Sequence, residues 1–312
     1  MTEGRFELFL QSHPRYCSAY DRLFAASRLL GTSAQLVYEL HPEELGSVAD
    51  DILSFVESAY PSNYLDTYIS RVKRMAELQA QFDANPSPAT LGDSTAVGTE
   101  AYSLALLLSI VFTSHRFEIM QALDKFLRNL PAESGGRLAS VGCGTGYELK
   151  LAAELLPTWD VVGYDTEAEM HGRAEQLLRF FHISKTVEFR NVFPLTDGSP
   201  IERPYDAVIL CELLEHLPDP AQALRAVRRQ LKDDGKMFLT AAINIAQEDH
   251  VFLYPDIETC RRQFSASGLE IEEEWIAPQT IRIPPANRET GFRKGNYIAT
   301  VAKAPGVRDF SS

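Results

Sequence analysis

The stretch RLASVGCGTGYELK, residues 137–150, places three glycines within five residues, between an apolar run and a helical pattern. The apolar run predicts a buried β-strand, and residues 147–156 have the spacing of an amphipathic helix. Because glycine has no Cβ, it permits tight turning and lets a ligand approach the backbone closely. The amide groups that open the following helix attract a carboxylate or a phosphate. The turn therefore predicts a ligand site at the end of a strand.

From residue 131 onward, short β-like runs alternate with helical ones. Strands are expected at 137–142, 160–165, 186–192, 205–212, 235–243, 269–277 and 296–304, and helices at 147–156, 167–181, 220–232 and 256–268. This alternation, with short links, is typical of an open α/β sheet with helices on both faces. No helical pattern separates the final two strands, so we expect them to form an antiparallel hairpin at one sheet edge.

Residues 1–130 have a helical pattern instead. Apolar residues recur at intervals of three and four along 19–40, 45–60, 64–82 and 99–130, the last with a break near Thr113 and Ser114. The run 83–98 is rich in proline, glycine and small polar residues and predicts a loop. The cationic pair His115 and Arg116 is expected at a solvated helix turn, with binding of a substrate carboxylate as the alternative. We therefore divide the chain into a helical region, 1–130, which caps a substrate site or mediates dimerisation, and an α/β domain, 131–312.

Composition narrows the class of protein. The 312 residues carry a net charge of −13 and no basic stripe, which argues against a nucleic-acid partner. The four cysteines show no CxxC spacing, as expected for reduced thiols. The N-terminus lacks a signal-peptide pattern, and the apolar run 104–112 is too short to span a bilayer. We expect a cytoplasmic protein that acts on a small molecule and makes no membrane contact.

The glycine spacing discriminates between nucleotide ligands. Gly142, Gly144 and Gly146 form G-x-G-x-G, whereas the dinucleotide fingerprint is G-x-G-x-x-G, so NAD is disfavoured. Asp165 ends the second expected strand, 165 − 142 = 23 residues after the first glycine. A carboxylate at that place accepts hydrogen bonds from both ribose hydroxyls. The pattern therefore favours a nucleoside other than NAD.

Four segments, LASVGCGTG, VVGYDTEAEM, YDAVILCELLEHLPDP and LKDDGKMFLT, resemble the class I S-adenosylmethionine-dependent methyltransferases in order and spacing, over residues of about 135–304. The resemblance implies a Rossmann-like sheet of strand order 3-2-1-4-5-7-6 with an antiparallel seventh strand. It also implies a set of contacts with S-adenosylmethionine. These are Gly142, Cys143, Gly144 and Gly146 beside the methionine part and the sulfonium, Asp165 on the ribose, Asn191 and Val192 at the adenine, and Cys211 and Glu212 flanking the cofactor. The family often has aspartate in place of Asn191, whose amide oxygen still accepts a hydrogen bond.

A second polar group follows the fourth expected strand. CELLEHLPDP places Glu212, Glu215 and His216 at i, i+3 and i+4, on one face of a helical turn, and His250 follows the neighbouring fifth strand. The pattern E-x-x-E-H with a later D-H-x-F resembles two metal-assisted methyltransferase groups. One acts on the 2′-hydroxyl at the 3′ end of small RNAs, and the other acts on catechols of the ubiquinone pathway. A cation lowers the pKa of a hydroxyl and orients its oxygen.

The same residues also fit metal-free roles. EHLPDP is frequent in metal-free members of the family, where His216 and His250 contact the substrate and one serves as a general base, or they are hydrogen-bonded histidines at a cleft rim. We expect direct methyl transfer to a small, specialised-metabolite acceptor, with His216 and His250 as candidate catalytic residues. Glu212, Glu215, His216 and His250 are candidate ligands of a divalent metal that assists hydroxyl methylation. The remaining alternatives are attack on the aminocarboxypropyl carbon, which releases methylthioadenosine, and a non-catalytic cofactor-binding protein.

Overall fold

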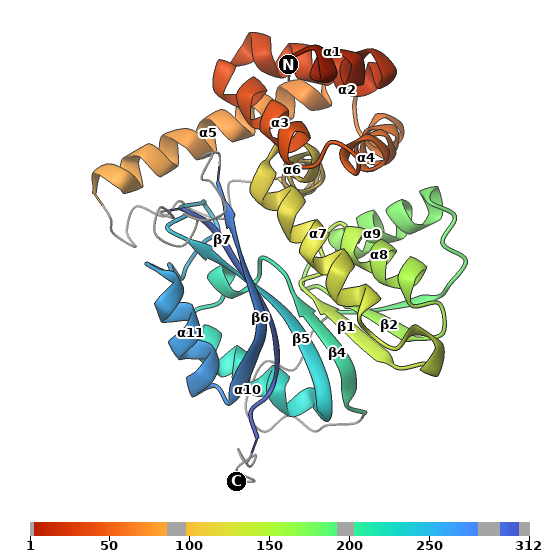
Figure 1. The fold of residues 1–312 in the computed structure, drawn as a ribbon, viewed down its shortest axis with the longest axis vertical. Helices are drawn as coiled ribbons and strands as arrows, with labels where there is room; N and C mark the ends of the chain where they lie inside the picture. Colours follow the sequence, from red (N-terminus) through yellow and green to blue (C-terminus); the bar gives the residue numbers. More distant parts are fainter. Residues whose placement is uncertain (1–2, 86–97, 192–202, 280–293, 306–312) are drawn as a thin grey trace.

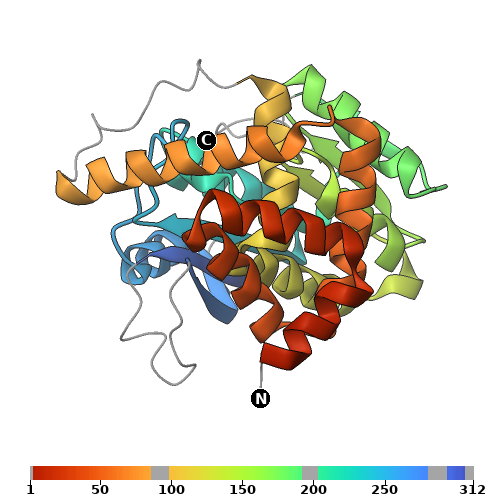
Figure 2. The same ribbon diagram turned by 90° about the horizontal axis from the view of Figure 1, so that it is seen from above.

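The computed structural model describes residues 3–85, 98–191, 203–279 and 294–305. The N-terminal half forms the helices α1 (Glu3–Ser12), α2 (Pro14–Ala26), α3 (Arg28–Leu40), α4 (Leu45–Ala59), α5 (Tyr64–Ala84), α6 (Thr99–Phe112) and α7 (Ser114–Arg128), followed by the short η3 (Ala132–Ser134). Helices α1 to α6 gather at one end of the sheet, as Figures 1 and 2 show from two directions. The predicted helical region therefore stands over one end of the α/β part.

The sheet has the order β3-β2-β1-β4-β5-β7-β6. Its strands are β1 (Arg137–Val141), β2 (Asp160–Tyr164), β3 (Val187–Arg190), β4 (Tyr205–Leu210), β5 (Leu231–Ile243), β6 (Leu269–Pro278) and β7 (Gly295–Lys303). β7 pairs antiparallel with both β5 and β6, and the other pairs are parallel. The predicted strand order, the reversed last strand and the hairpin at the sheet edge are confirmed.

Apolar side chains cover both faces of the sheet. Successive residues such as Leu138 and Ala139 of β1, or Phe238 and Leu239 of β5, belong to two different core clusters, because neighbouring side chains of a strand point to opposite faces. One cluster includes residues of α7, α8 (Tyr147–Leu155) and α9 (Ala168–Phe180). The other includes residues of α10 (Pro220–Gln230) and α11 (Ile257–Ala266). Strands buried on both faces explain the continuous apolar runs in the sequence.

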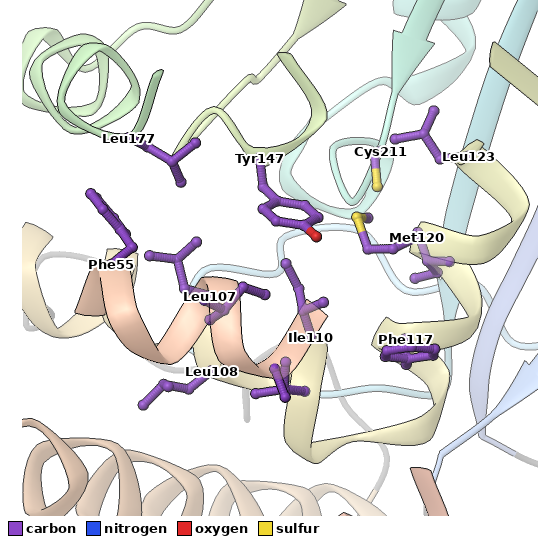
Figure 3. Close-up of a cluster of buried hydrophobic side chains, with 14 of the residues drawn as sticks. Phe55, Leu107, Leu108, Ile110, Phe117, Met120, Leu123, Tyr147, Leu177 and Cys211 are labelled. Carbon is purple, nitrogen blue, oxygen red and sulfur yellow. The ribbon is translucent and has the colours of Figure 1, made fainter. Parts of the chain in front are cut away.

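The N-terminal helices share a core with the α/β part. Figure 3 shows Leu107 and Ile110 of α6 beside the ring of Tyr147, and Met120 of α7 beside Cys211 at the end of β4. The ring of Phe55 on α4 packs against Phe180 at the end of α9, with 5.4 Å between ring centroids. One cluster thus crosses the boundary predicted at residue 130, and the division into two domains stays a prediction.

The helix expected at 19–40 is two helices, and this expectation was wrong. Ser27 has an extended backbone, with φ −165° and ψ 126°; its N–H donates to Leu23 O at the end of α2, and its carbonyl accepts from Gly31 N in α3. Any Cβ at Gly31 would collide with the ring of Phe24, so glycine lets α3 fold back on α2. The break predicted near Thr113 is confirmed, since α6 ends at Phe112 and α7 begins at Ser114.

Most of the loop predicted at 83–98 lies outside the described residues, although α5 continues to Ala84. Within the described ranges, no single helix is long and apolar enough to cross a membrane. Helices α6 and α7 pass that test only as a pair, and their axes differ by 84°.

Candidate functional site

The glycine turn between β1 and α8 needs glycine for its backbone conformation. Gly142, Gly144 and Gly146 have φ of 73°, 48° and 80°, a region that other residues rarely adopt. Gly142 N–H and Cys143 N–H both donate to Tyr164 O, at 2.8 and 2.9 Å, which fixes the turn against β2. A Cβ at Gly146 would also lie 2.9 Å from Ala174 Cα in α9. The turn is thus held by strain-free glycines and by close packing of α8 on α9.

Asp165 points into this turn. Its Oδ2 accepts from Gly144 N–H at 2.9 Å, and its Oδ1 accepts from Glu167 N–H at 3.0 Å. Each oxygen retains capacity for a further hydrogen bond, so the carboxylate can also receive a ribose diol. Asn191 is exposed and directly follows β3, the strand that pairs with β2. Val192 lies outside the described residues. The glycine turn and Asp165 therefore form one hydrogen-bonded unit, the cradle.

Glu212 stands two residues after β4 with a φ of 52°, which a non-glycine residue seldom adopts. Its Oε1 accepts from Thr240 Oγ1 at 2.8 Å and from Asn296 Nδ2 at 2.5 Å. Its Oε2 lies 3.2 Å from Arg116 Nη1. The carboxylate is therefore committed to neighbours on β5, β7 and α7, next to the buried thiol of Cys211.

Arg116 and His115 are buried, so the solvated turn expected for them was wrong. Each is 9% exposed, because the first turn of α7 packs against the end of the sheet beside β4. Burial lowers the pKa of His115 to about 4, and its ring is neutral near pH 7. Arg116 keeps its charge beside Glu212. The sequence offered no direct sign of this pair, since an arginine in an apolar helix usually reaches solvent.

Glu148, in the first turn of α8, is a further acid at this place. Ser140 Oγ donates to its Oε2 at 2.9 Å. Burial raises the pKa of Glu148 to about 7, although the hydrogen bond from Ser140 and the charge of Arg116 act in the opposite direction. Our reading of the sequence missed Glu148. Its position directly after the glycine turn was the signal that could have found it.

Glu215, His216 and His250 form a compact cluster beyond the end of β4. One potential ligand atom from each residue lies within 4.8 Å of the others. Glu215 is completely buried, and neither of its carboxylate oxygens has a hydrogen-bond partner among the described residues. Burial, and the charge of Glu212, raise the pKa of Glu215 well above its usual range. A buried, unpartnered carboxylate is costly, so it must be protonated or meet a cation.

Backbone carbonyls orient both imidazoles of this cluster. His216 Nδ1 lies 3.0 Å from Asp249 O, and His250 Nδ1 lies 2.8 Å from Ile245 O. A carbonyl only accepts, so we assign the hydrogen to Nδ1 in each ring and a free lone pair to Nε2. Burial and the neighbouring His216 lower the pKa of His250 to about 4, so that ring is neutral and a weak proton acceptor near pH 7. Two imidazoles and one carboxylate suit a divalent cation such as Zn, Mn or Fe.

The structure brings together three of the four residues considered as metal ligands and places Glu212 in the ion pair with Arg116. The helical spacing does not include Glu212, because the turn η4 begins only at Leu214. The positive φ of Glu212 reverses the chain before that turn, and its side chain therefore departs from the expected face.

Known proteins with similar sequences include several methyltransferases. The family model described as a methyltransferase domain matches residues 112–274, just over half of the chain. An uncharacterized 37.1 kDa protein in transposon TN4556 of Streptomyces fradiae is 31% identical over 183 residues, 52% of this chain and 49% of that protein. The demethylmenaquinone methyltransferase of Lactobacillus johnsonii is 27% identical over 144 residues, 42% of this chain and 57% of that protein. The ubiquinone biosynthesis O-methyltransferase of Methylococcus capsulatus is 31% identical over 118 residues, 37% of this chain and 47% of that protein. The chain thus spans about half the length of these curated relatives.

Proposed function

Because this chain belongs to the class I S-adenosylmethionine-dependent methyltransferases, we propose that it transfers the methyl group of that cofactor directly to a small-molecule acceptor. The observation that carries the proposal is the cradle itself: three glycines with positive φ, and the carboxylate of Asp165 hydrogen-bonded to Gly144 N–H. We propose a specialised metabolite as the acceptor. The net charge of −13 supports a small acceptor over a nucleic acid.

When bound, S-adenosylmethionine supplies an electrophilic methyl group on its sulfonium. Within the chain, Asp165 holds the ribose hydroxyls and the glycine turn borders the ligand. Leu106 of α6 lies beside this turn, with its Cδ1 3.4 Å from where a Cβ of Gly144 would be. Helix α6 therefore contributes apolar surface beside the turn at Gly144.

Calorimetry with S-adenosylmethionine tests this proposal. We expect binding to the wild-type chain and a loss of at least ~100-fold in affinity in Asp165→Ala, since two hydrogen bonds to a carboxylate contribute on the order of 3 kcal/mol. Asp66→Ala, on the exposed surface of α5, is the matched control. Absence of binding to the wild type would refute the proposal. Formation of methylthioadenosine in place of S-adenosylhomocysteine would show attack on the aminocarboxypropyl carbon instead.

A second proposal concerns the acceptor atom. We propose that Glu215, His216 and His250 hold a divalent cation and that the acceptor group is a hydroxyl. The buried, unpartnered carboxylate of Glu215 supports this, as do the two oriented imidazoles. Such a cation lowers the pKa of a bound hydroxyl. One relative is by name an O-methyltransferase.

Metal removal tests the second proposal. We expect exhaustive chelation to abolish turnover and added Mn²⁺ or Zn²⁺ to restore it, without a change in affinity for S-adenosylmethionine. Turnover that is insensitive to chelation and equal in His250→Ala would refute the cation. His216 would then be the residue to test as a general base, by the pH profile of turnover in His216→Gln.

A further inference from the structure

Helix α5 grips the chain segment that carries His250. This segment, residues 244–252, follows β5 at the end of the sheet over which α5 runs, as Figures 1 and 2 show. Gln79 Nε2 donates to Asn244 O at 3.0 Å, and Gln79 Oε1 accepts from Ala246 N–H at 3.0 Å. One side-chain amide thus satisfies two main-chain groups of a buried segment, as a neighbouring strand would.

The residue between these two anchor points is Ile245. Its carbonyl oxygen lies 2.8 Å from His250 Nδ1 and so sets the orientation of that imidazole. Gln79 therefore holds the tripeptide on both sides of the group that orients His250. Ile245 and Ala246 are 4% and 2% exposed, so water does not substitute for the contacts of Gln79.

An ion cluster around the buried carboxylate of Glu248 holds the same segment two residues before His250. Glu248 is 3% exposed, and its carboxylate pairs with both Arg71 and Arg74 of α5. The guanidinium of Arg71 also stacks 5.4 Å over the ring of Tyr102 in α6. A buried carboxylate is stable only beside its cations, so the segment stays in place only while α5 is docked.

The opposite side of the segment is bound to the cluster. Val251 N–H and Phe252 N–H both donate to Glu215 O at 2.9 Å, and Asp249 O orients His216. The segment therefore contacts α5 on one side and Glu215 and His216 on the other, and it contributes His250 to the cluster. The backbone groups that orient His250 and His216 therefore belong to the same segment that α5 contacts.

We propose that α5 is a positioning element of the site, in which Gln79, Arg71 and Arg74 fix the backbone that orients His250 and His216. The helical N-terminal region then completes the site and does not merely cover it. This inference rests on the proposed cation site for its functional consequence. The contacts of α5 with residues 244–252, which we call the α5 grip, can be tested without reference to a cation.

The test uses the full chain with two pairs of variants. Gln79→Ala removes the grip, and Gln81→Ala, an exposed glutamine on the same helix, is its control. Arg74→Ala is the milder second variant, since that side chain is 64% exposed, and exposed Lys73→Ala is its control. Hydrogen exchange of residues 244–252 reports the grip. Co²⁺ titration, followed by visible absorption, reports the geometry of the cluster, and calorimetry with S-adenosylmethionine checks that the cradle is intact.

We expect at least ~10-fold faster exchange of the Ala246 amide in Gln79→Ala. We also expect an affinity for Co²⁺ weaker by roughly 3- to 10-fold, which is less than the ~10- to 100-fold effect of losing a direct partner of a metal ligand, because Gln79 acts on His250 through the backbone of Ile245. Arg74→Ala should show the same changes at smaller size, and both controls should match the wild type. Exchange and Co²⁺ binding equal to the wild type in both variants would overturn the inference. If the wild type binds no Co²⁺, the cation proposal is refuted, and unchanged exchange in Gln79→Ala would then refute the grip as well.

Discussion

The guanidinium of Arg116 lies 3.2 Å from the carboxylate of Glu212, in a pair whose side chains are 11% and 16% exposed. The pair joins the first turn of α7 to the chain just after β4. Both charges are largely out of water, and each depends on the other. The ion pair therefore connects a helix of the N-terminal region to the end of β4, near the site of the proposed reaction.

Arg116→Ala should be strongly destabilising. Glu212 would keep its hydrogen bonds to Thr240 and Asn296 but lose its cation, which costs on the order of 3 kcal/mol in the free energy of unfolding. Urea unfolding measures the loss. Arg128→Ala is the control, because Arg128 is 62% exposed in its pair with Asp124, and we expect a change of about 0.5 kcal/mol or less. Equal effects of the two changes would contradict the buried pair.

Two substitutions of glycine by alanine should change the free energy of unfolding in opposite directions. Gly146→Ala forces a side chain into φ of 80° and against the backbone of Ala174, so we expect a loss of at least ~2 kcal/mol in stability and weaker binding of S-adenosylmethionine. Gly172→Ala, inside α9 with nothing within 4 Å of the new Cβ, should stabilise by about 0.5–1 kcal/mol. Thermal unfolding of both variants is sufficient. A neutral Gly146→Ala would show that the turn tolerates side chains.

The α/β part could be predicted closely from the sequence because its strands are buried on both faces. Continuous apolar runs such as 205–210 have few other places in a fold, and short links between alternating elements leave few topologies. The N-terminal helices were harder to delimit. The interruption at Ser27 depends on how Phe24 packs over Gly31, a tertiary contact that helical periodicity does not reveal.

Two parts of the candidate site could be predicted as neighbours: the glycine turn with Asp165, and Glu215 and His216 with His250. The first two are close in sequence, and the others follow β4 and β5, which are adjacent in the sheet. The position of Glu212 depends on its positive φ and on contacts with Arg116, Thr240 and Asn296. All three of these partners are far from Glu212 in the sequence. The two hydrogen bonds of Gln79 join it to residues that are 165 and 167 positions later in the chain, and no periodic pattern in the sequence indicates such a contact.

Glu148 should make stability depend on pH. Its pKa is raised from 4.5 to about 7 in the folded chain, so the protonated form is preferred there. The contribution to stability is complete below pH 4.5 and is lost as pH rises through 7, by up to roughly 3 kcal/mol. Glu148→Gln removes this term. We expect the variant to gain stability relative to the wild type between pH 5 and pH 8 in urea unfolding, and a difference that is constant with pH would argue against a buried, ionisable Glu148.

Glu215→Gln should separate stability from cation binding. The substitution keeps the shape of the side chain but removes a buried, ionisable carboxyl group that has no partner among the described residues. Without added metal at pH 8, we expect the variant to be at least as stable as the wild type, because burying a neutral amide costs less than burying a carboxylate. Its affinity for Co²⁺ should fall by at least ~100-fold, since a neutral amide is a poor ligand for this cation.

Glu248→Gln is the contrasting change: that carboxylate is paired with Arg71 and Arg74, and its loss should destabilise the chain. If Glu215→Gln were as destabilising as Glu248→Gln, Glu215 would have a structural partner, and the cluster would not be a cation site.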